Sequence, residues 1–150
     1  MFKFVRSLDG SYLQPRTVKA AAGTYKTGMA LKIGNGVAAA ASGNVKVTLI
    51  ALENKTLDSE GELIVADVTY GMIFEAPISA FSASTQKVGA SVTIHTDSLG
   101  VTATAAATLY ASTASGSYSS GSEIGAFSGA CIYDMGGAAA AGDVIHIRFN

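Results

Sequence analysis

The chain of 150 residues is long enough to form one domain with its own hydrophobic core, and its length gives no reason to expect a second. Its formal net charge is −1 and its ten lysine and arginine residues are scattered, which excludes the basic stripe that a nucleic-acid partner requires. Only 14% of the residues are charged, against about 25% in a typical soluble domain, so we expect part of the surface to be buried against copies or partners.

The sequence gives no indication of secretion, a membrane span or a disulfide. MFKFVRSLDG reaches Asp9 before any apolar stretch of signal-peptide length, so we expect a protein that is made and kept inside a cell. The longest weakly polar region, Val101 to Ala114, is interrupted by threonines and a serine and is too short to cross a bilayer. Cys131 is the only cysteine, and its apolar neighbours favour burial over catalysis.

Short alternating or β-branched runs recur along the whole chain and predict strands. In chain order these runs are Phe2–Leu8, Met29–Ile33, Val45–Leu52, Glu62–Val68, Met72–Ala76, Val88–His95, Gly125–Tyr133 and Val144–Phe149. Turn signals rich in glycine, asparagine, aspartate and serine separate them, and no capped helical period is sustained. The sequence therefore predicts a mainly β fold: a single-domain small β-barrel or β-sandwich with short hairpins and at most one short helix.

Three segments fit this pattern less well. Ala103–Ala111 is the stretch that could form two helical turns. Ala111–Ser122 is rich in serine, glycine and threonine and has little to bury, so it is expected to be an exposed loop or an arm between subunits. The third segment is residues 1–20, which form either an extended N-terminal arm or an ordinary first strand. The sequence as a whole predicts one β domain over residues 1–150.

The stretch IGNGVAAAASG contains the spacing G-x-G-x-x-A at Gly34, Gly36 and Ala39, which is also found in dinucleotide-binding loops. Such a fold needs a crossover helix of about ten residues or more before the next strand. Only Val37–Asn44 are available for that helix, because a new strand pattern begins at Val45. The sequence therefore predicts an antiparallel hairpin in which Gly34-Asn35-Gly36 form a three-residue loop with positive φ angles.

A second candidate site contains the two histidines. His95 and Asp97 are two residues apart at the end of a strand-like run, and His146 lies in a later one. On a strand, His95 and Asp97 would share a face, and His146 from a neighbouring strand would complete a site with two histidines and one carboxylate for iron. This pattern resembles the metal motif of the Fe(II)/2-oxoglutarate oxygenases. In that family an arginine from a further strand binds the oxo acid, and here the sequence has only Arg148 close after His146.

Three longer stretches carry a broader resemblance: AAAGTYKTGMALKIGNGVAAA, GELIVADVTYGMIFEAPI and AAAAGDVIHIRFN. They contain a glycine-marked turn before a short hairpin, a strand-turn-strand unit, and a closing strand that follows Gly-Asp. In these features the chain resembles the capsid decoration, or cement, proteins of tailed bacteriophages.

That resemblance implies a compact β-barrel or β-tulip domain, commonly assembled as a trimer, that binds across neighbouring major capsid protein subunits on the outer surface of the virion. It implies synthesis in the host cytoplasm, no enzymatic activity, no cofactor, and no nucleic-acid or membrane partner. The head fibre base, or another β-rich assembly protein, is a further alternative, although the long repetitive extension of a fibre is not seen in this sequence.

Two regions are candidates for the interface. The first is near the N-terminus, where an extended alternating segment could add a strand to a capsid edge; its residues are Phe2, Phe4 and Arg6. The second is the most apolar run of the chain, which could anchor a subunit interface; its residues are Met72, Phe74, Pro77, Ile78 and Phe81. The alternatives are an ordinary first strand for the former and the chain's own core for the latter.

Overall fold

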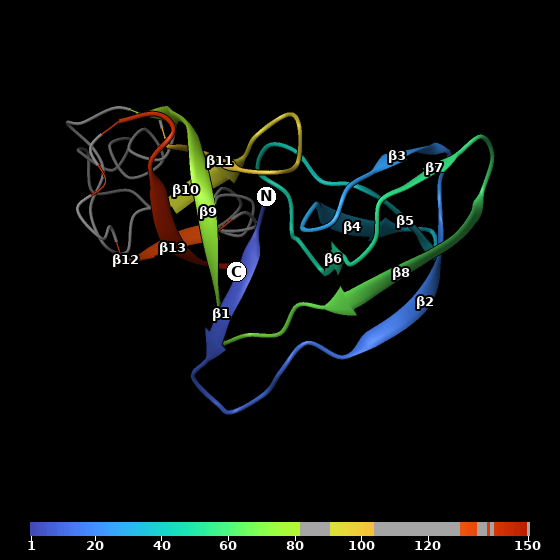
Figure 1. Ribbon diagram of the computed structural model, residues 1–150, viewed down its shortest axis with the longest axis horizontal. Coiled ribbons are helices and arrows are strands. Elements are labelled where there is room, and N and C mark those ends of the chain that lie inside the picture. The colour runs from blue at the N-terminus through green and yellow to red at the C-terminus, as the bar shows by residue number, and fades with distance from the viewer. Residues whose placement is uncertain (82–90, 104–129, 135–137, 139, 150) are drawn as a thin grey trace, which may run out of the picture.

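The computed structural model describes residues 1–81, 91–103, 130–134, 138 and 140–149, and every regular element in these ranges is a β-strand (Figure 1). The predicted mainly β class is therefore confirmed. Of the segments 103–111 and 111–122, whose structure the sequence left open, only Ala103 lies within the described residues, where it ends a strand.

Five strands of the N-terminal half close into a small barrel. They are β2 (Pro15–Ala20), β4 (Ala30–Gly34), β5 (Val37–Ala40), β6 (Leu49–Ala51) and β8 (Gly61–Asp67), in the order β2-β5-β4-β6-β8. Its interior is filled by fully buried side chains, among them Leu31, Leu49, Leu63 and Val65. The short strands β3 (Gly23–Tyr25) and β7 (Lys55–Leu57) form a separate two-stranded antiparallel sheet beside it (Figure 1).

The β4–β5 connection is the predicted hairpin. The two strands are antiparallel, and Gly34 pairs with Val37, so the loop consists of Asn35 and Gly36 alone rather than of three residues. Both loop residues have positive φ angles, 51° and 79°, as the favoured two-residue hairpin turn requires. Because β5 follows directly, no crossover helix is present, and the dinucleotide-binding alternative is excluded.

A second ring of strands forms the other half of the molecule (Figure 1). Its strands are β9 (Met72–Phe81), β10 (Ser91–Ile94), β11 (Val101–Ala103), β12 (Ala130–Asp134) and β13 (Val144–Phe149). The strands pair in the order β9-β11-β10-β12-β13, and a further pairing of β13 with β9 closes them into a ring. β1 (Lys3–Ser7) is added to the opposite edge of β9 from β13.

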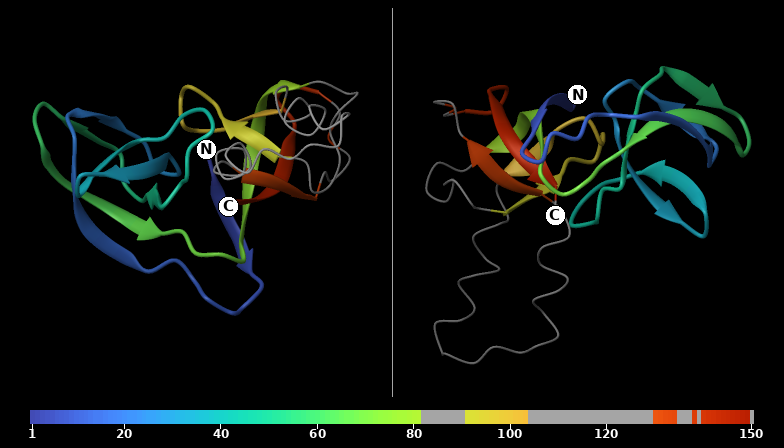
Figure 2. Two further views of the ribbon diagram at one scale, coloured as in Figure 1. Left: turned by 180° about the vertical axis from the view of Figure 1, so that it is seen from behind. Right: turned by 90° about the horizontal axis from the view of Figure 1, so that it is seen from below.

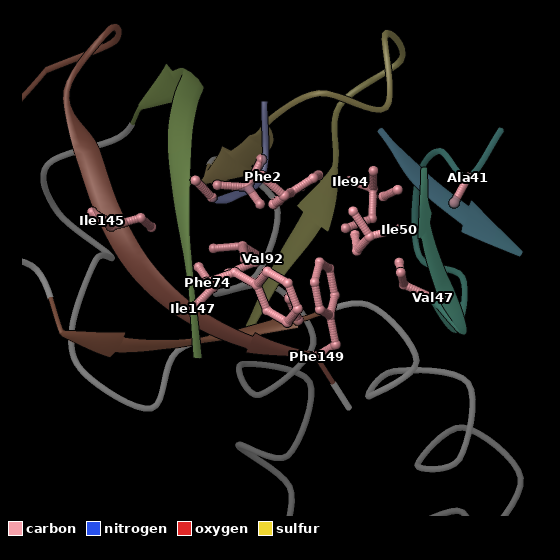
Figure 3. Close-up of a cluster of buried hydrophobic side chains, with 14 of the residues drawn as sticks. Phe2, Ala41, Val47, Ile50, Phe74, Val92, Ile94, Ile145, Ile147 and Phe149 are labelled. Carbon is pink, nitrogen blue, oxygen red and sulfur yellow. The ribbon is translucent and has the colours of Figure 1, made fainter. Parts of the chain in front are cut away.

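The two rings lie side by side along the long axis (Figures 1 and 2) and share one hydrophobic cluster. Ile50 of β6 points into this cluster, whereas its neighbours Leu49 and Ala51 point into the first barrel, as expected from the alternation of side chains along a strand. Figure 3 shows Ile50 next to Ile94 of β10. Two backbone hydrogen bonds between Gly43 and Ile94, of 2.7 and 3.0 Å, reinforce this contact.

Of the two alternatives for residues 1–20, the pairing of the strands favours ordinary strands over an extended arm. β1 pairs antiparallel with β9, and β2 pairs antiparallel with β8 from Pro15↔Ala66 to Ala20↔Gly61. Since their backbone groups are used within the chain's own sheets, residues 3–7 and 15–20 are ordinary strands.

Candidate interaction surface

The candidate iron site is not formed. Nδ1 of His95 lies 3.1 Å from Oδ1 of Asp97, so this pair converges as expected, but in a turn after β10 rather than on a strand. His146 lies in β13, between Glu75 of β9 and Asp134 of β12. The described residues, which include all three predicted ligands, contain no group of three His, Cys, Asp or Glu side chains that could hold a metal ion. The alternative hypothesis that these three residues form one metal site is therefore contradicted.

Asp97 has a structural role in its turn. Its Oδ1 accepts a hydrogen bond of 2.8 Å from the Leu99 backbone N–H. Partial burial raises the pKa of Asp97, but this hydrogen bond and the contact with His95 outweigh burial, so the pKa lies below its ordinary value. The carboxylate therefore stabilises the turn that leads into β11.

Most of the predicted interface residues belong to the chain's own core. Phe2, Met72, Phe74 and Ile78 are each at most 3% exposed and lie in the shared cluster. Phe4 packs against the same cluster, with its ring in edge contact with that of Phe74 at 5.7 Å. The side chains of Phe2, Met72, Phe74 and Ile78 are thus covered by the chain itself, whereas Phe4 is only partly buried.

The three other predicted interface residues have different positions. Pro77 is half-buried in β9, opposite the exposed Val144. Phe81 ends β9, where its backbone pairs with Ala103, and its side chain lies outside the described residues. Arg6 is exposed on β1.

Arg6 belongs to a group of arginine and tyrosine side chains that we call the arginine–tyrosine surface. It comprises Arg6 of β1, Tyr70 before β9, Tyr133 of β12 and Arg148 of β13. The guanidinium of Arg148 lies 4.7 Å from the ring centre of Tyr70, and that of Arg6 lies 5.9 Å from the ring centre of Tyr133. Both distances are within the range of cation–π attraction. Tyr70 is 74% exposed, so the larger part of its side chain remains accessible to a partner.

The register of the sheet brings the two arginines together. Arg6 and Arg148 both pair with Ile73 of β9, one from each side, and paired residues of antiparallel strands point to the same face. Ile73 is fully buried but lies outside the core cluster that contains Met72 and Phe74. It therefore points to the outer face of the sheet, and the apolar stems of the arginines lie beside it.

Two β-bulges adjust the direction of these side chains. The pairing of β1 with β9 shifts between Phe4 and Arg6, and that of β12 with β13 shifts between Ile132 and Asp134. Tyr133 is the extra residue of the second bulge, and its hydroxyl accepts a long hydrogen bond of 3.5 Å from Arg6. Bulges commonly redirect side chains in this way near functional surfaces.

Neither Arg6 nor Arg148 forms an ion pair with a carboxylate of the described residues. Arg16, by contrast, donates two hydrogen bonds of 2.7 Å to Asp67. Nε of Arg148 is buried and has no hydrogen-bond partner in the described part of the chain. Burial keeps Nε of Arg148 from a partner, but the described residues supply no carboxylate for the other guanidinium nitrogens of Arg6 and Arg148, which remain possible donors.

The turn after β1 adjoins this surface at Leu8 and carries exposed side chains. The Leu8 backbone N–H donates a hydrogen bond of 3.0 Å to the carbonyl of Gly71, which follows Tyr70 directly. Leu8 is 53% exposed, and Tyr12, four residues on, is 68% exposed. Aromatic and arginine side chains are enriched in protein–protein interfaces, so this composition favours contact with another protein.

Asp9 organises this turn. Its carboxylate accepts hydrogen bonds from the hydroxyls of Ser11 and Ser7 and from the Ser11 backbone N–H. These bonds, the hydroxyl of Ser11 foremost, lower the pKa of Asp9 to about 2.

We expect the Asp9 carboxyl to titrate near pH 2 in a pH series of NMR spectra. Because its folded-state pKa is below the unfolded value, the resulting stabilisation is complete above the unfolded pKa and is lost as the pH falls toward about 2. Ser11→Ala removes the strongest of the bonds and is expected to raise the pKa. A wild-type midpoint at the ordinary value for aspartate would show that the turn does not hold this geometry in solution.

A groove of about 470 Å³ lies at the β3–β7 sheet and is lined by Thr24, Tyr25, Lys26, Asn54, Lys55 and Thr56. Several of its polar groups are already used within the chain. The Tyr25 hydroxyl donates to the carbonyl of Ala21 at 2.7 Å, and Nζ of Lys55 lies 3.8 Å from Glu53. The groove therefore has fewer free polar groups for a binding partner than the arginine–tyrosine surface has.

Sequence reasoning found Arg6 but not the other members of this surface. The sequence connects Arg148 only with His146, and Tyr70 and Tyr133 stand in separate segments. Their proximity depends on the register of β1, β9, β12 and β13. The chain matches no protein-family model and no curated protein, so similarity to known proteins does not add to this assignment. No helix of the described residues is long and apolar enough to cross a membrane.

Proposed function

We propose that this chain is a virion structural protein that decorates the icosahedral capsid of a tailed bacteriophage and stabilises it by binding across major capsid protein subunits. The observation that carries the proposal is the arginine–tyrosine surface, whose two guanidinium groups and exposed Tyr70 are suited to contact with protein. The low share of charged residues and the resemblance of three sequence stretches to decoration proteins support the same role.

In this role the protein acts by burial of surface rather than by chemistry. Each bound copy adds contacts that exist only in the expanded shell, so opening of the shell must break these contacts as well as those between capsid subunits. Binding to one state stabilises that state by mass action. Many equivalent contacts on a symmetric shell add up through multivalency. The protein would be made in the host cytoplasm and would lie on the outer face of the capsid.

The test is co-sedimentation with empty shells assembled from the major capsid protein of the virus that encodes this chain. We expect the protein to sediment with expanded shells at a fixed ratio to the capsid subunits, and not with unexpanded shells. Decorated shells should also lose their integrity at a higher temperature than bare ones, as followed by light scattering. If expanded shells sediment without the protein at saturating concentration, the proposed function is wrong.

A further inference from the structure

The described residues contain a group of three exposed carboxylates, of which one forms an ion pair with a lysine and two form none. The connection from β7 to β8, together with the start of β8, carries Asp58, Glu60 and Glu62, all exposed, which we call the acidic turn. Oε1 of Glu60 lies 3.3 Å from Nζ of Lys19. The carboxylates of Asp58 and Glu62 form no ion pair or hydrogen bond with any described residue.

The other carboxylates of the described chain already have partners. They are Asp9, Glu53, Asp67, Glu75, Asp97, Asp134 and Asp143. Two carboxylates of the acidic turn, those of Asp58 and Glu62, thus form no ion pair. They equal in number the two guanidinium groups without an ion pair, those of Arg6 and Arg148, and carry the opposite charge.

One chain cannot bring these two groups together. The acidic turn lies at one end of the long axis, at the tip of the first barrel, whereas β1, β9 and β13 belong to the other half of the molecule (Figures 1 and 2). The complementary charges can therefore meet only between two copies.

We propose that the arginine–tyrosine surface of one copy binds the acidic turn of a second copy. Arg6 and Arg148 would donate charge-assisted hydrogen bonds to Asp58 and Glu62, and Tyr70 would cover the contact. The inference rests on the proposed function, in which copies lie beside one another on the shell, and it assigns the two arginines of this surface to a neighbouring copy rather than to the capsid protein. It makes self-assembly a property of the chain that exists before any capsid is bound.

Such a contact is heterologous, because two different surface regions meet. Repetition of the contact forms a closed ring when the rotation between neighbours closes, and an open filament when it does not. A ring of three would match the trimer that the resemblance to decoration proteins implies.

Exposed lysines are weaker candidates for the same role. Lys26, Lys32 and Lys46 are also exposed and form no ion pair with described residues. An ammonium is a compact, strongly hydrated charge, whereas a guanidinium presents a planar set of donors that fits a carboxylate and stacks on aromatic rings. The arginines are the cations that lie over tyrosine rings in the described residues.

The experiment measures the oligomeric state of the full chain by native mass spectrometry over a dilution series. We expect wild type to form a discrete oligomer. Charge reversal on either side, as Arg6→Glu/Arg148→Glu or as Asp58→Lys/Glu62→Lys, should raise the dissociation constant at least about tenfold, because like charges then face each other. A chain that carries all four substitutions should assemble again, since opposite charges meet once more at every contact.

Lys32→Glu/Lys46→Glu is the matched control, because it changes the net charge by the same amount as the arginine variant at positions outside both regions. It should leave the oligomer unchanged. Circular dichroism verifies that each variant is folded. The acidic-turn variant alters only exposed side chains, so it tests the contact even if replacement of Arg148, beside buried Ile73, unfolds the chain.

A monomeric wild type would overturn the inference, as would an oligomer that resists both folded charge-reversal variants, or a folded four-site variant that remains dissociated. These outcomes are separable from failure of the proposed function. A monomer that still binds expanded shells would refute self-assembly and leave the capsid role in place. An oligomer that depends on both regions but does not bind shells would support the contact between copies and refute the capsid role.

Discussion

Phe74→Ala is expected to lower the free energy of unfolding by about 4 kcal/mol, the range found when large aromatic side chains are removed from a core. Phe74 is fully buried in β9, and its ring lies 5.2 Å from that of Phe149 (Figure 3). It also lies 5.7 Å from the ring of Phe4, and both pairs are in edge contact. The substitution removes these aromatic contacts and leaves a cavity where β1, β9 and β13 meet.

Urea denaturation followed by circular dichroism measures this effect, with the slope of the transition unchanged if the denatured state is unaffected. Tyr12→Ala is the control, since that side chain is 68% exposed, and it should change the free energy of unfolding by no more than about 0.5 kcal/mol. A loss below about 1 kcal/mol for Phe74→Ala would contradict the placement of Phe74 in the core.

Gly28→Ala is expected to destabilise the protein by about 3 kcal/mol, because it combines backbone strain with overpacking. Gly28 has a φ of +76°, and a Cβ at this position would lie 2.5 Å from the backbone oxygen of Phe2. Its carbonyl accepts a hydrogen bond of 2.9 Å from the Phe2 N–H, and its N–H donates one of 2.8 Å to the carbonyl of Ala51. The substitution therefore forces apart the N-terminal segment and the barrel.

Gly10→Ala separates the two contributions to this effect. Gly10 has nearly the same φ, +80°, but an added Cβ would meet no atom within 4 Å. It should therefore cost only the strain of the left-handed backbone, about 1 kcal/mol. Thermal unfolding of the two variants side by side gives the difference. Equal losses would mean that Gly28 is required for its φ angle alone and that the close approach to Phe2 is not present in solution.

Where local chemistry decides the structure, the sequence was sufficient. A two-residue hairpin turn requires positive φ angles, and Asn35-Gly36 adopts them readily. Because this dipeptide lies between two apolar runs, the β4–β5 hairpin could be predicted from a few neighbouring residues. The same reasoning overlooked β2, whose residues PRTVKA are mostly exposed and do not alternate, because pairing with β8 rather than burial defines that strand.

Pro77 shows how a partner strand can override a local signal. The predicted strand stops at Ala76, before the proline, but β9 continues to Phe81. On one edge of β9 the pairing with β1 ends at Glu75 and that with β11 begins at Ile78, so Pro77 falls in the gap where no donor is needed. This gap exists only because two different strands share that edge.

The arginine–tyrosine surface depends wholly on such long-range pairing. Arg6 and Arg148 are 142 positions apart in the sequence and become neighbours because each pairs with Ile73. The apolar run that the sequence offers as a candidate interface lies in the core for the same reason, since closure of the second ring covers Phe74 and Ile78.

The sequence by itself determined the mainly β class, the positions of most strands and the β4–β5 hairpin, because alternation and turn residues act over a few neighbours. Only the tertiary structure decided that the strands close into two rings, that His146 lies apart from the His95–Asp97 pair, and that Arg6 and Arg148 lie together. These outcomes depend on strand order and register, which are set by the fit of distant side chains around a shared core, and a linear pattern does not specify that fit.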